Sequence, residues 1–483
     1  MSQRSFIVVG GGLGGLATGL RLAHRGHRVT LFEKNSAIGG RNTSLTVNDC
    51  IFDIGPTLLM MLDPFHKLFR DVGERFEDHL DISLCDPNYR VFYSDGNQID
   101  STTNMAKMVR SIERLSGPVD AASYPKMIGK LGEMYHESLP SFVRKNYDSP
   151  LDLVRLSAGK MALKHGMLGN LAAGMKKYYA DPRLQMLFSF QTMYLGLSPH
   201  DAPWVYAVLV YMEYGEGIWY PKGGLTEISR KVGMLAQQRG VDIRLNAPVA
   251  AIDGKSVRLE SGEVFTADAV ICNADLPYAE RDLAPTKQPP KPHRYSCSAY
   301  NVYMDYEGEL PDLLHHDIML GSNFDENLDQ IFNRREIPTD PAFYVAASCK
   351  TEPSMAPPGH SNLQILVPCP NLDHPWTEGD AINLETKAFA RLTKEVGFDP
   401  GKIRGFKRIT PTDWKRDLNL DRGATFGLSH DFMQTACFRP SNKSKANPGL
   451  YYVGAGTVPG NGLPMVLISA ELAEQRLEKD GLL

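Results

Sequence analysis

The glycine-rich turn after the first predicted strand constrains the fold of this chain more than any other feature. Residues 5–9 form a short, mostly apolar stretch, and the sequence GGGLGG follows at positions 10–15. Apolar residues spaced three to four apart then predict a helix, and residues 27–32 predict a second strand that ends at Glu33. A strand, a GxGxxG turn, a helix, a strand and an acid in this order are typical of a dinucleotide-binding βαβ unit. The chain is therefore predicted to contain a Rossmann-like α/β domain.

Each position of the turn has a physical role. Gly10 permits the tight turn, Gly12 lets the backbone approach a pyrophosphate, and Gly15 allows the helix to pack closely on the strand. The backbone amides at the start of the helix, at Leu13 and Gly14, face the phosphates, where the helix dipole favours negative charge. All five residues are candidate contacts of the dinucleotide.

Glu33 narrows the choice of nucleotide. A carboxylate at the end of the second strand would accept hydrogen bonds from ribose hydroxyls, which disfavours a 2′-phosphate and argues against NADP. A glycine-rich turn in some other α/β fold is the alternative, but the full order of strand, helix and acid favours a dinucleotide. At this point NAD and FAD both remain open.

The segment after Glu33 favours FAD. Lys34 follows the acid, a Gly-Gly-Arg sequence ends at Arg41, and a Gly-Pro pair stands at 55–56. Arg41 carries a forked set of donors that suits a phosphate or the edge of a flavin. This pattern resembles the FAD-binding signature of the flavin amine oxidase and carotenoid desaturase superfamily, and the resemblance implies FAD as the cofactor. The cofactor contacts that it implies are Lys34, Gly40, Arg41, Gly55 and Pro56.

The middle of the chain resembles the same superfamily. A helix, a strand and a three-strand meander are predicted over 225–265, and a buried strand over 267–274. In the superfamily this order of elements returns the chain to the FAD domain. The resemblance implies that Val249 lies against the adenine and that Asn273 lies in the small turn after the last strand.

The C-terminal segment supplies a second glycine-rich motif. A buried strand is predicted over 450–453, followed by glycines and a helix that starts near residue 465. The motif resembles the terminal motif of bacterial and fungal carotenoid desaturases, which runs under the flavin. Many members have His where this chain has Val458, so no role for that imidazole is carried over. The cofactor contacts that the resemblance implies here are Gly454, Gly456, Gly462, Leu463 and Pro464.

Residues 178–224 are rich in aromatic and aliphatic side chains, with a Gly-x-Ser-Pro step and an aromatic-Pro-basic-Gly-Gly turn. This stretch resembles the carotenoid desaturases rather than the amine oxidases, and the resemblance implies a polyene or isoprenoid substrate. Such a ligand has almost no hydrogen-bonding groups, so its affinity comes from burying apolar area, at roughly 25 cal/mol per Å². The alternative is that these residues only form core.

A membrane surface is the partner that this substrate would require. Residues 151–180 carry leucines and methionines among five basic residues and one acid, Asp152. A basic amphipathic segment can lie in a membrane interface, although an ordinary solvated helix is the alternative. The N-terminus enters the first strand within five residues, which leaves no room for a signal peptide, and no apolar run is long enough to span a membrane. We therefore expect a cytoplasmic protein that is peripherally associated with the membrane.

Composition excludes several other classes. The 52 basic and 56 acidic residues nearly cancel, so the chain lacks the excess of positive charge that is typical of nucleic-acid-binding proteins. The seven cysteines show no metal-ligand spacing and suit buried thiols in a reducing cytoplasm, and no metal is predicted. The sequence does not specify an oligomeric state.

The resemblance implies desaturation by hydride transfer to flavin, with loss of a proton from the neighbouring carbon. Asp201, Glu213 and Glu216 are candidate proton acceptors by position, but each also fits an exposed carboxylate. Lys222 is a candidate neighbour of the flavin or its phosphates rather than a base. No catalytic base is named, and oxygen or a quinone is expected to reoxidise the flavin.

The predicted fold class is α/β, with a Rossmann-like FAD-binding domain built from discontinuous segments and an inserted α+β substrate or lid domain. The FAD-binding segments are 1–100, 221–285 and 436–483, and the substrate and membrane-associating segments are 101–220 and 286–435.

The function implied by the resemblance is a phytoene-type or dehydrosqualene-type carotenoid desaturase. A related polyene isomerase, saturase or terminal oxidase shares the same motifs. A non-catalytic prenyl-lipid carrier of the same fold is an alternative of another class, and the two glycine-rich fingerprints and Glu33 argue against it. Substrate length, C30 or C40, is not specified by the sequence.

Overall fold

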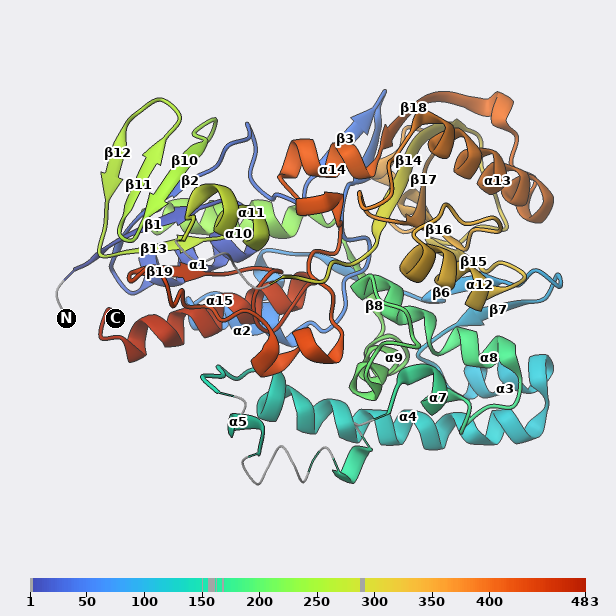
Figure 1. The fold of residues 1–483 in the computed structure, drawn as a ribbon. Helices are drawn as coiled ribbons and strands as arrows, with labels where there is room; N and C mark the ends of the chain where they lie inside the picture. The colour runs from blue at the N-terminus through green and yellow to red at the C-terminus, as the bar shows by residue number, and fades with distance from the viewer. Residues whose placement is uncertain (1–2, 150, 155–160, 162, 167–168, 287–291) are drawn as a thin grey trace.

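A computed structural model describes residues 3–149, 151–154, 161, 163–166, 169–286 and 292–483, and the structural statements below refer to these residues. A parallel sheet with its helices forms one side of the molecule, and a larger mixed sheet forms the other (Figure 1). A layer of helices that includes α3, α4, α7 and α8 lies beneath the mixed sheet in this view. The two sheets thus belong to one α/β fold, as predicted.

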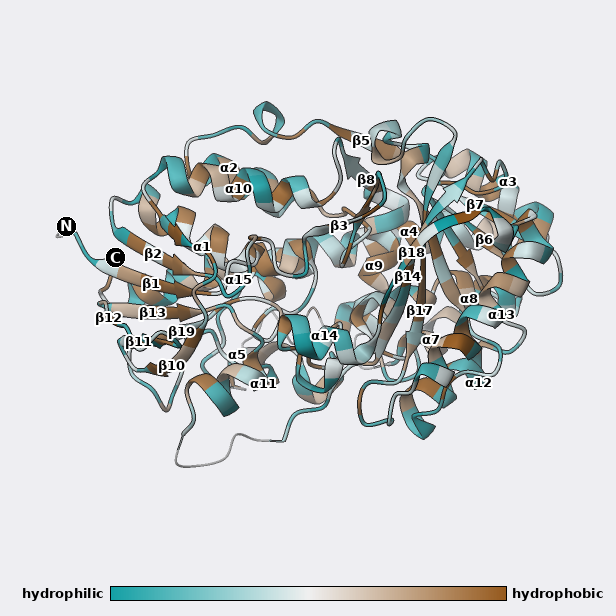
Figure 2. Ribbon diagram, turned by 90° about the horizontal axis from the view of Figure 1, so that it is seen from above, coloured by the Kyte–Doolittle hydropathy of each residue, from teal (hydrophilic) through white to brown (hydrophobic). Residues whose placement is uncertain are grey.

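The parallel sheet is assembled from three distant parts of the chain. Its strands, in spatial order, are β19 (Leu450–Tyr452), β13 (Ala269–Cys272), β1 (Ser5–Val9), β2 (Arg28–Phe32) and β9 (Asp242–Arg244). Every neighbouring pair is parallel. Such strands are short and apolar because both faces of the sheet are covered. Figure 2 shows these strands coloured largely as hydrophobic.

Alternate residues of β1 point into different cores. Phe6 and Val8 pack with the helices on one face, and Ile7 and Val9 pack with a three-stranded meander on the other. The helices are α1 (Leu13–His24), α10 (Thr226–Gln238), α15 (Leu463–Lys479) and α2 (Asp63–Asp71). The meander is β10 (Val249–Asp253), β11 (Ser256–Leu259) and β12 (Val264–Thr266), followed by α11 (Leu276–Tyr278). The predicted helices and meander are therefore confirmed.

The mixed sheet has seven strands, most of them from a region where the sequence offered few motifs. In spatial order they are β18 (Ile403–Ile409), β14 (Ser298–Glu307), β17 (His360–Cys369), β16 (Phe343–Ala347), β15 (His316–Met319), β6 (Tyr89–Phe92) and β7 (Gln98–Ser101). All pairs are antiparallel except β15 with β6. The domain limits stay a prediction, although β6 and β7 join this sheet from the segment 1–100 that was assigned to the FAD-binding domain.

The remaining elements cover the mixed sheet or join the two sides. The helices are α3 (Met105–Ser116), α4 (Pro118–Ser138), α5 (Leu151–Val154), α7 (Leu171–Met175), α8 (Pro182–Leu187), α9 (Val208–Tyr211), α12 (Phe324–Asp329), α13 (Glu378–Val396) and α14 (Pro411–Leu418). Two antiparallel pairs lie outside these sheets: β3 (Ser44–Val47) forms a hairpin with β4 (Cys50–Asp53), and β5 (Ile82–Cys85) pairs with the distant β8 (Ile218–Pro221). Within the described part of the chain, none of the helices combines the length and the apolar character that a membrane span requires.

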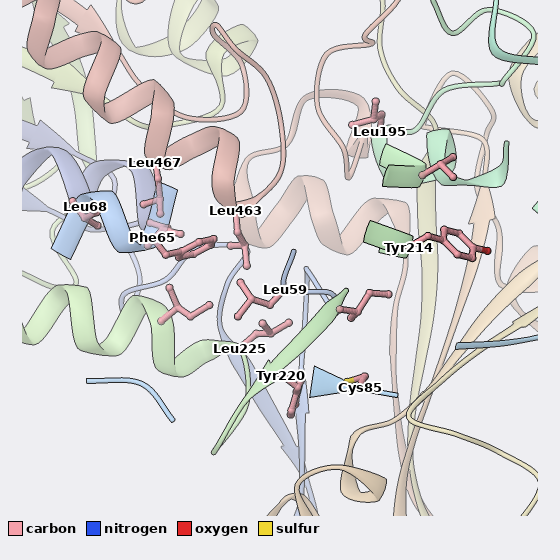
Figure 3. Close-up of a cluster of buried hydrophobic side chains, with 14 of the residues drawn as sticks. Leu59, Phe65, Leu68, Cys85, Leu195, Tyr214, Tyr220, Leu225, Leu463 and Leu467 are labelled. Carbon is pink, nitrogen blue, oxygen red and sulfur yellow. The ribbon is translucent and has the colours of Figure 1, made fainter. Parts of the chain in front are cut away.

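One large hydrophobic core links the two sides of the molecule. Leu463 and Leu467 on α15 lie near Leu59 and Phe65, while Tyr220 on β8 extends the same cluster toward the mixed sheet (Figure 3). Residues far apart in the sequence thus share one continuous core. This shared core fixes the position of the α15 start relative to the segments around it.

Candidate functional site

A single large cavity joins the glycine-rich motifs to the aromatic block. Its volume is about 720 Å³, and its lining includes the β1–α1 turn at one end and residues of the mixed sheet at the other. Every sequence-predicted cofactor contact except Gly15 lines it. Gly15 lies beneath the turn, where an added Cβ would be 3.2 Å from Cγ1 of Val8, in agreement with its predicted role in packing the helix on the strand.

The β1–α1 turn presents free backbone amides to this cavity. Gly10 has a φ of +100°, which glycine adopts without strain. α1 starts at Leu13, and no side chain of the described residues caps its N-terminus. A Cβ added at Gly14 would lie 2.8 Å from Oδ1 of Asn273 and 3.4 Å from Cα of Gly454. The N-terminal and C-terminal glycine motifs and Asn273 therefore meet at one place.

Glu33 is buried at the end of β2 and organises the turn. Its Oε2 atom accepts a hydrogen bond from the Gly11 amide at 2.6 Å, and its Oε1 atom accepts one from the Asn35 amide at 2.9 Å. Lys34 also lines the cavity, but its ammonium group donates to the carbonyl oxygen of Asp417 at 2.7 Å. Burial lowers the pKa of Lys34. Lys34 thus ties the end of β2 to α14.

Arg41 places a guanidinium group at the cavity wall. It lines the cavity, and its Nη1 atom donates to the carbonyl oxygen of Thr425 at 2.9 Å. Burial lowers the pKa of Arg41, and the nearby Asp275 acts against this shift. Burial raises the pKa of Asp275 to about 6. The guanidinium has further donors for a ligand, because within the described part of the chain its hydrogen bond to Thr425 uses only one of its nitrogens.

A second helix start faces the cavity at the C-terminal motif. α15 begins at Leu463 after Gly462, whose φ is +104°, and no side chain of the described residues caps it. The preceding loop is held by Arg439, which is 3% exposed and was missed by the sequence analysis. Its Nη2 and Nε atoms donate to the carbonyl oxygens of Ala455 at 2.6 Å and Thr457 at 2.9 Å.

An imidazole from another segment packs against this loop. Val458 stands where many family members have His, but Nε2 of His430 accepts a hydrogen bond from the Asn461 amide at 3.2 Å. Burial holds the pKa of His430 well below its usual value, so the ring is neutral. The sequence analysis missed His430 because it lies 28 residues before Val458 and carries no motif.

The other end of the cavity is apolar. Phe190, Tyr194, Tyr206 and Leu209 come from the predicted substrate block, and strands of the mixed sheet complete the wall. The mixed-sheet residues of this wall include Asn301, Ile318, Phe343, Tyr344 and Leu366. The block is thus part of a cavity wall and not only core.

The candidate proton acceptors have very different environments. Asp201 and Lys222 are exposed and do not line the cavity. Glu216 is half-buried and accepts a hydrogen bond from the Tyr135 hydroxyl at 3.1 Å. Glu213 is fully buried, which corrects the alternative of an exposed carboxylate. Burial raises the pKa of Glu213 to about 7.

The basic amphipathic segment is described only in part. Arg155, Leu156, Lys160, Met167 and Leu168, and the side chain of Leu153, lie outside the described residues. Leu151 and Leu163 are exposed, at 73% and 79%, whereas Leu171 and Met175 are buried in the core. Lys164 pairs with Glu137. The segment therefore divides between core and surface.

The fold also gathers Cys85, His315 and His316, whose ligand atoms lie within 4.8 Å of one another. No sequence motif indicates this cluster, because Cys85 at the end of β5 and the histidine pair at the start of β15 are 230 residues apart. Nδ1 of His315 bonds to the hydroxyl of Thr351 at 2.8 Å, and Nδ1 of His316 bonds to the hydroxyl of Tyr344 at 2.7 Å. Sγ of Cys85 also lies 3.8 Å from Nδ1 of His315, so the three residues belong to one buried polar network.

The donor set fits a dinucleotide. Two helix N-termini without side-chain caps offer backbone amides and positive dipole ends, as a pyrophosphate requires. The glycines leave room for close approach of the ligand, and Glu33 and Arg41 add one acceptor and one cation at the cavity wall.

Comparisons with known proteins agree with this geometry. Residues 13–476 match the family described as flavin containing amine oxidoreductase. The chain is 41% identical to the zeta-carotene-forming phytoene desaturase of Myxococcus xanthus, over 98% of this chain and 94% of the relative. It is 33% identical to the carotenoid 3,4-desaturase of Haloarcula japonica, over 99% of both chains.

A crystal structure of an oxidoreductase from Methanosarcina mazei has the same fold. The TM-score is 0.64 at 18% identity, and the match covers 98% of this chain and 100% of the other. The family match and the relatives together show that the chain belongs to the carotenoid desaturase family within the flavin-containing amine oxidoreductases.

Proposed function

We propose that the protein is an FAD-dependent enzyme that desaturates a long apolar isoprenoid of the phytoene or dehydrosqualene type. The continuity of one cavity carries the proposal: the same space is lined by the two glycine-rich motifs and by the aromatic wall. Relatives named phytoene desaturase and carotenoid 3,4-desaturase support the reaction class.

Several residues of this chain would hold FAD. The starts of α1 and α15 would face the pyrophosphate and the flavin side, and Glu33 would accept from ribose hydroxyls. Val249 would lie against the adenine, and Arg41 would meet a phosphate or the flavin edge. Bound FAD would supply the redox chemistry by accepting a hydride from an allylic carbon.

The protein itself would bind, orient and shield the substrate. The aromatic and aliphatic wall would bury the polyene chain and exclude water from the reacting carbons. No hydrogen bond to the substrate is needed for affinity, so the shape of the cavity would set the position of the reacting bond. Oxygen or a quinone remains our expectation for the terminal electron acceptor.

We also propose that the protein contacts a membrane surface, because the substrate dissolves only there. Two cavity-lining segments, 142–147 and 435–436, are flanked by exposed apolar residues. Leu151 follows the first segment, and Phe432, Met433 and Phe438 flank the second, with Met433 60% exposed. Exposed apolar side chains beside a cavity suit an interfacial contact.

The test uses the purified protein with FAD under anaerobic conditions. Phytoene or dehydrosqualene in liposomes is added, the visible absorbance of the flavin is followed, and the products are extracted. Bleaching with new polyene bands is the expected result, and the better of the two substrates gives the chain length. A flavin that stays oxidised with both would move the assignment to an isomerase, saturase or late oxidase, and a protein that binds no flavin would favour a lipid carrier.

A further inference from the structure

A buried thiol and two imidazoles meet beside the mixed-sheet wall of the cavity. Cys85 ends β5, and His315 and His316 stand at the start of β15. Each of the three side chains is at most 5% exposed. One ligand atom of each residue lies within 4.8 Å of the ligand atoms of the other two. Thiolates and imidazoles are the usual ligands of zinc in proteins, so the cluster has the composition of a metal site.

The sulfur and one ring nitrogen already have nearly the separation that a shared ion requires. Sγ of Cys85 lies 3.8 Å from Nδ1 of His315. Zinc binds sulfur at about 2.3 Å and nitrogen at about 2.0 Å, and tetrahedral angles then separate the two ligand atoms by about 3.6 Å. The ion would replace the hydrogen bond of 2.8 Å between this nitrogen and the Thr351 hydroxyl, which leaves that oxygen available for the fourth position. An ion therefore fits between the two ligands after a small shift of the side chains.

His316 supplies an independent observation that points to a ligand. Its Nδ1 atom bonds to the Tyr344 hydroxyl at 2.7 Å. Its Nε2 atom is buried and has no hydrogen-bond partner among the described residues. An unpaired buried nitrogen costs free energy, and a bond from Nε2 to an ion would remove that cost. Imidazoles that bind metals usually make a hydrogen bond through their other nitrogen, as His316 does with Tyr344.

The ligand types also select the ion. Magnesium and calcium prefer oxygen ligands, and within the described part of the chain the cluster contains no carboxylate. Zinc and copper both suit thiolate and imidazole ligands. Zinc has no redox chemistry of its own and is the usual ion of buried structural sites with sulfur and nitrogen ligands. The cluster therefore favours zinc.

We propose that Cys85, His315 and His316 bind one Zn²⁺ ion that fastens β5 to β15. This inference does not depend on the proposed function. The Cys85 thiol loses its proton to water as the zinc–sulfur bond forms, and the two imidazoles bind through the lone pairs of neutral rings. No atom changes its oxidation state. One proton is released for each ion that binds.

The position of the cluster indicates a structural role for the ion. Among the residues that the structure describes, the cavity lining does not include Cys85, His315 or His316. β5 pairs with β8 outside the mixed sheet, whereas β15 lies inside that sheet between β16 and β6. The ion would thus join two sheets. Tyr344 on β16 lines the cavity and bonds to His316, so the same ion would steady the cavity wall.

The first measurement is the metal content of untagged protein from zinc-supplemented medium, after dialysis against metal-free buffer. The wild type should hold about one zinc per chain by elemental mass spectrometry. Cys85→Ala and His316→Ala should each retain almost none, because two ligands hold zinc far less tightly than three. Cys369→Ala is the matched control, because Cys369 is also a buried thiol, on β17 of the mixed sheet, and it should leave the zinc content unchanged.

Two further measurements keep the test valid even if a variant fails to fold. Wild-type protein from cobalt-supplemented medium should show a charge-transfer band from thiolate to cobalt, which reports a sulfur ligand directly. Saturating zinc should raise the melting temperature of the metal-free wild type by about 3 °C. Flavin absorbance should be the same with and without zinc, because the ligands do not line the cavity.

Each contrary result has a defined meaning. A wild-type protein with neither bound zinc nor a cobalt–thiolate band would overturn the site. Zinc that is retained by Cys85→Ala and His316→Ala, or lost equally from Cys369→Ala, would overturn the assigned ligands. Uptake of copper but not zinc would overturn the choice of ion. A flavin that substrate does not reduce would contradict the proposed function and leave the zinc site standing.

Discussion

Replacement of Gly15 by alanine tests whether the nucleotide turn depends on direct contact between helix and strand. Gly15 lies in the first turn of α1 and is buried. An added Cβ would lie well inside 3.0 Å of the carbonyl oxygen of Gly10, and 3.2 Å from Cβ of Asn273. The Gly10 carbonyl belongs to the backbone and cannot rotate away. The start of α1 must therefore move away from β1.

The magnitude follows from two opposing effects. Overpacking of this kind costs about 1–3 kcal/mol, and the rigid neighbour places Gly15 toward the upper end. Alanine in a helix regains about 0.5–1 kcal/mol relative to glycine. We expect a net loss of about 2 kcal/mol in the free energy of unfolding. Because the displaced turn also carries Gly12 and Gly14, flavin affinity should fall at least about tenfold.

Gly129 provides the matched control. It also lies inside a helix, α4, but it is exposed and an added Cβ would meet nothing within 4 Å. Gly129→Ala should therefore stabilise the protein by about 0.5–1 kcal/mol and leave flavin affinity unchanged. Urea denaturation measures the stability of both variants, and quenching of flavin fluorescence measures their affinity.

The opposite signs of the two effects make the test decisive. Gly15→Ala with wild-type stability and wild-type flavin affinity would refute the packing argument for the turn. A loss of stability in both variants would also refute it, because replacement of any helical glycine by alanine would then explain the effect without contact to a strand.

Three other variants test separate parts of the structure. The pKa of Glu213 is about 7 in the folded protein and 4.5 when unperturbed. Between these pH values the carboxyl group is ionised in the unfolded chain but still protonated in the native state, so the free energy of unfolding falls as the pH rises. As the pH rises from ~4.5 to ~7, the free energy of unfolding of Glu213→Gln, measured by urea denaturation, should increase by about 3 kcal/mol relative to the wild type. A difference between the two proteins that does not change with pH would contradict the burial argument. Arg439→Met leaves the carbonyls of Ala455 and Thr457 unpaired, so it should lower the free energy of unfolding by about 3 kcal/mol and cause loss of bound flavin. Retained flavin absorbance with an unchanged melting temperature would disprove this role. The double change Phe432→Ser and Met433→Ser should weaken liposome flotation about tenfold or more without loss of flavin, and unchanged flotation would place the membrane contact elsewhere.

The cofactor side of the site was largely predictable because its physics is local. The turn at Gly10–Gly15 requires a positive φ and close backbone approach, and few residues other than glycine permit them. The same holds for the loop that ends at Gly462. The acid that follows β2 belongs to the same local motif, since Glu33 accepts a hydrogen bond from the amide of Gly11, 22 residues earlier in the chain.

The substrate side was less predictable because its geometry depends on distant pairings. The mixed sheet joins β6 and β7 to strands more than 200 residues later, and no local pattern specifies such partners. Glu213 illustrates the difference. Its sequence neighbourhood fits an exposed carboxylate as well as a buried one, and only packing against Tyr89 and Gln191 removes it from water.

The sequence by itself thus determined the parallel sheet, the nucleotide motifs and the apolar character of the substrate block, because strand alternation, glycine conformations and buried runs are properties of short segments. The tertiary structure alone decided which acid is buried, which imidazole packs on the loop after Val458, and how Arg439 holds that loop. These features arise from contacts between side chains that are distant in the sequence. Burial shifts the pKa of a group only once tertiary packing has removed it from water.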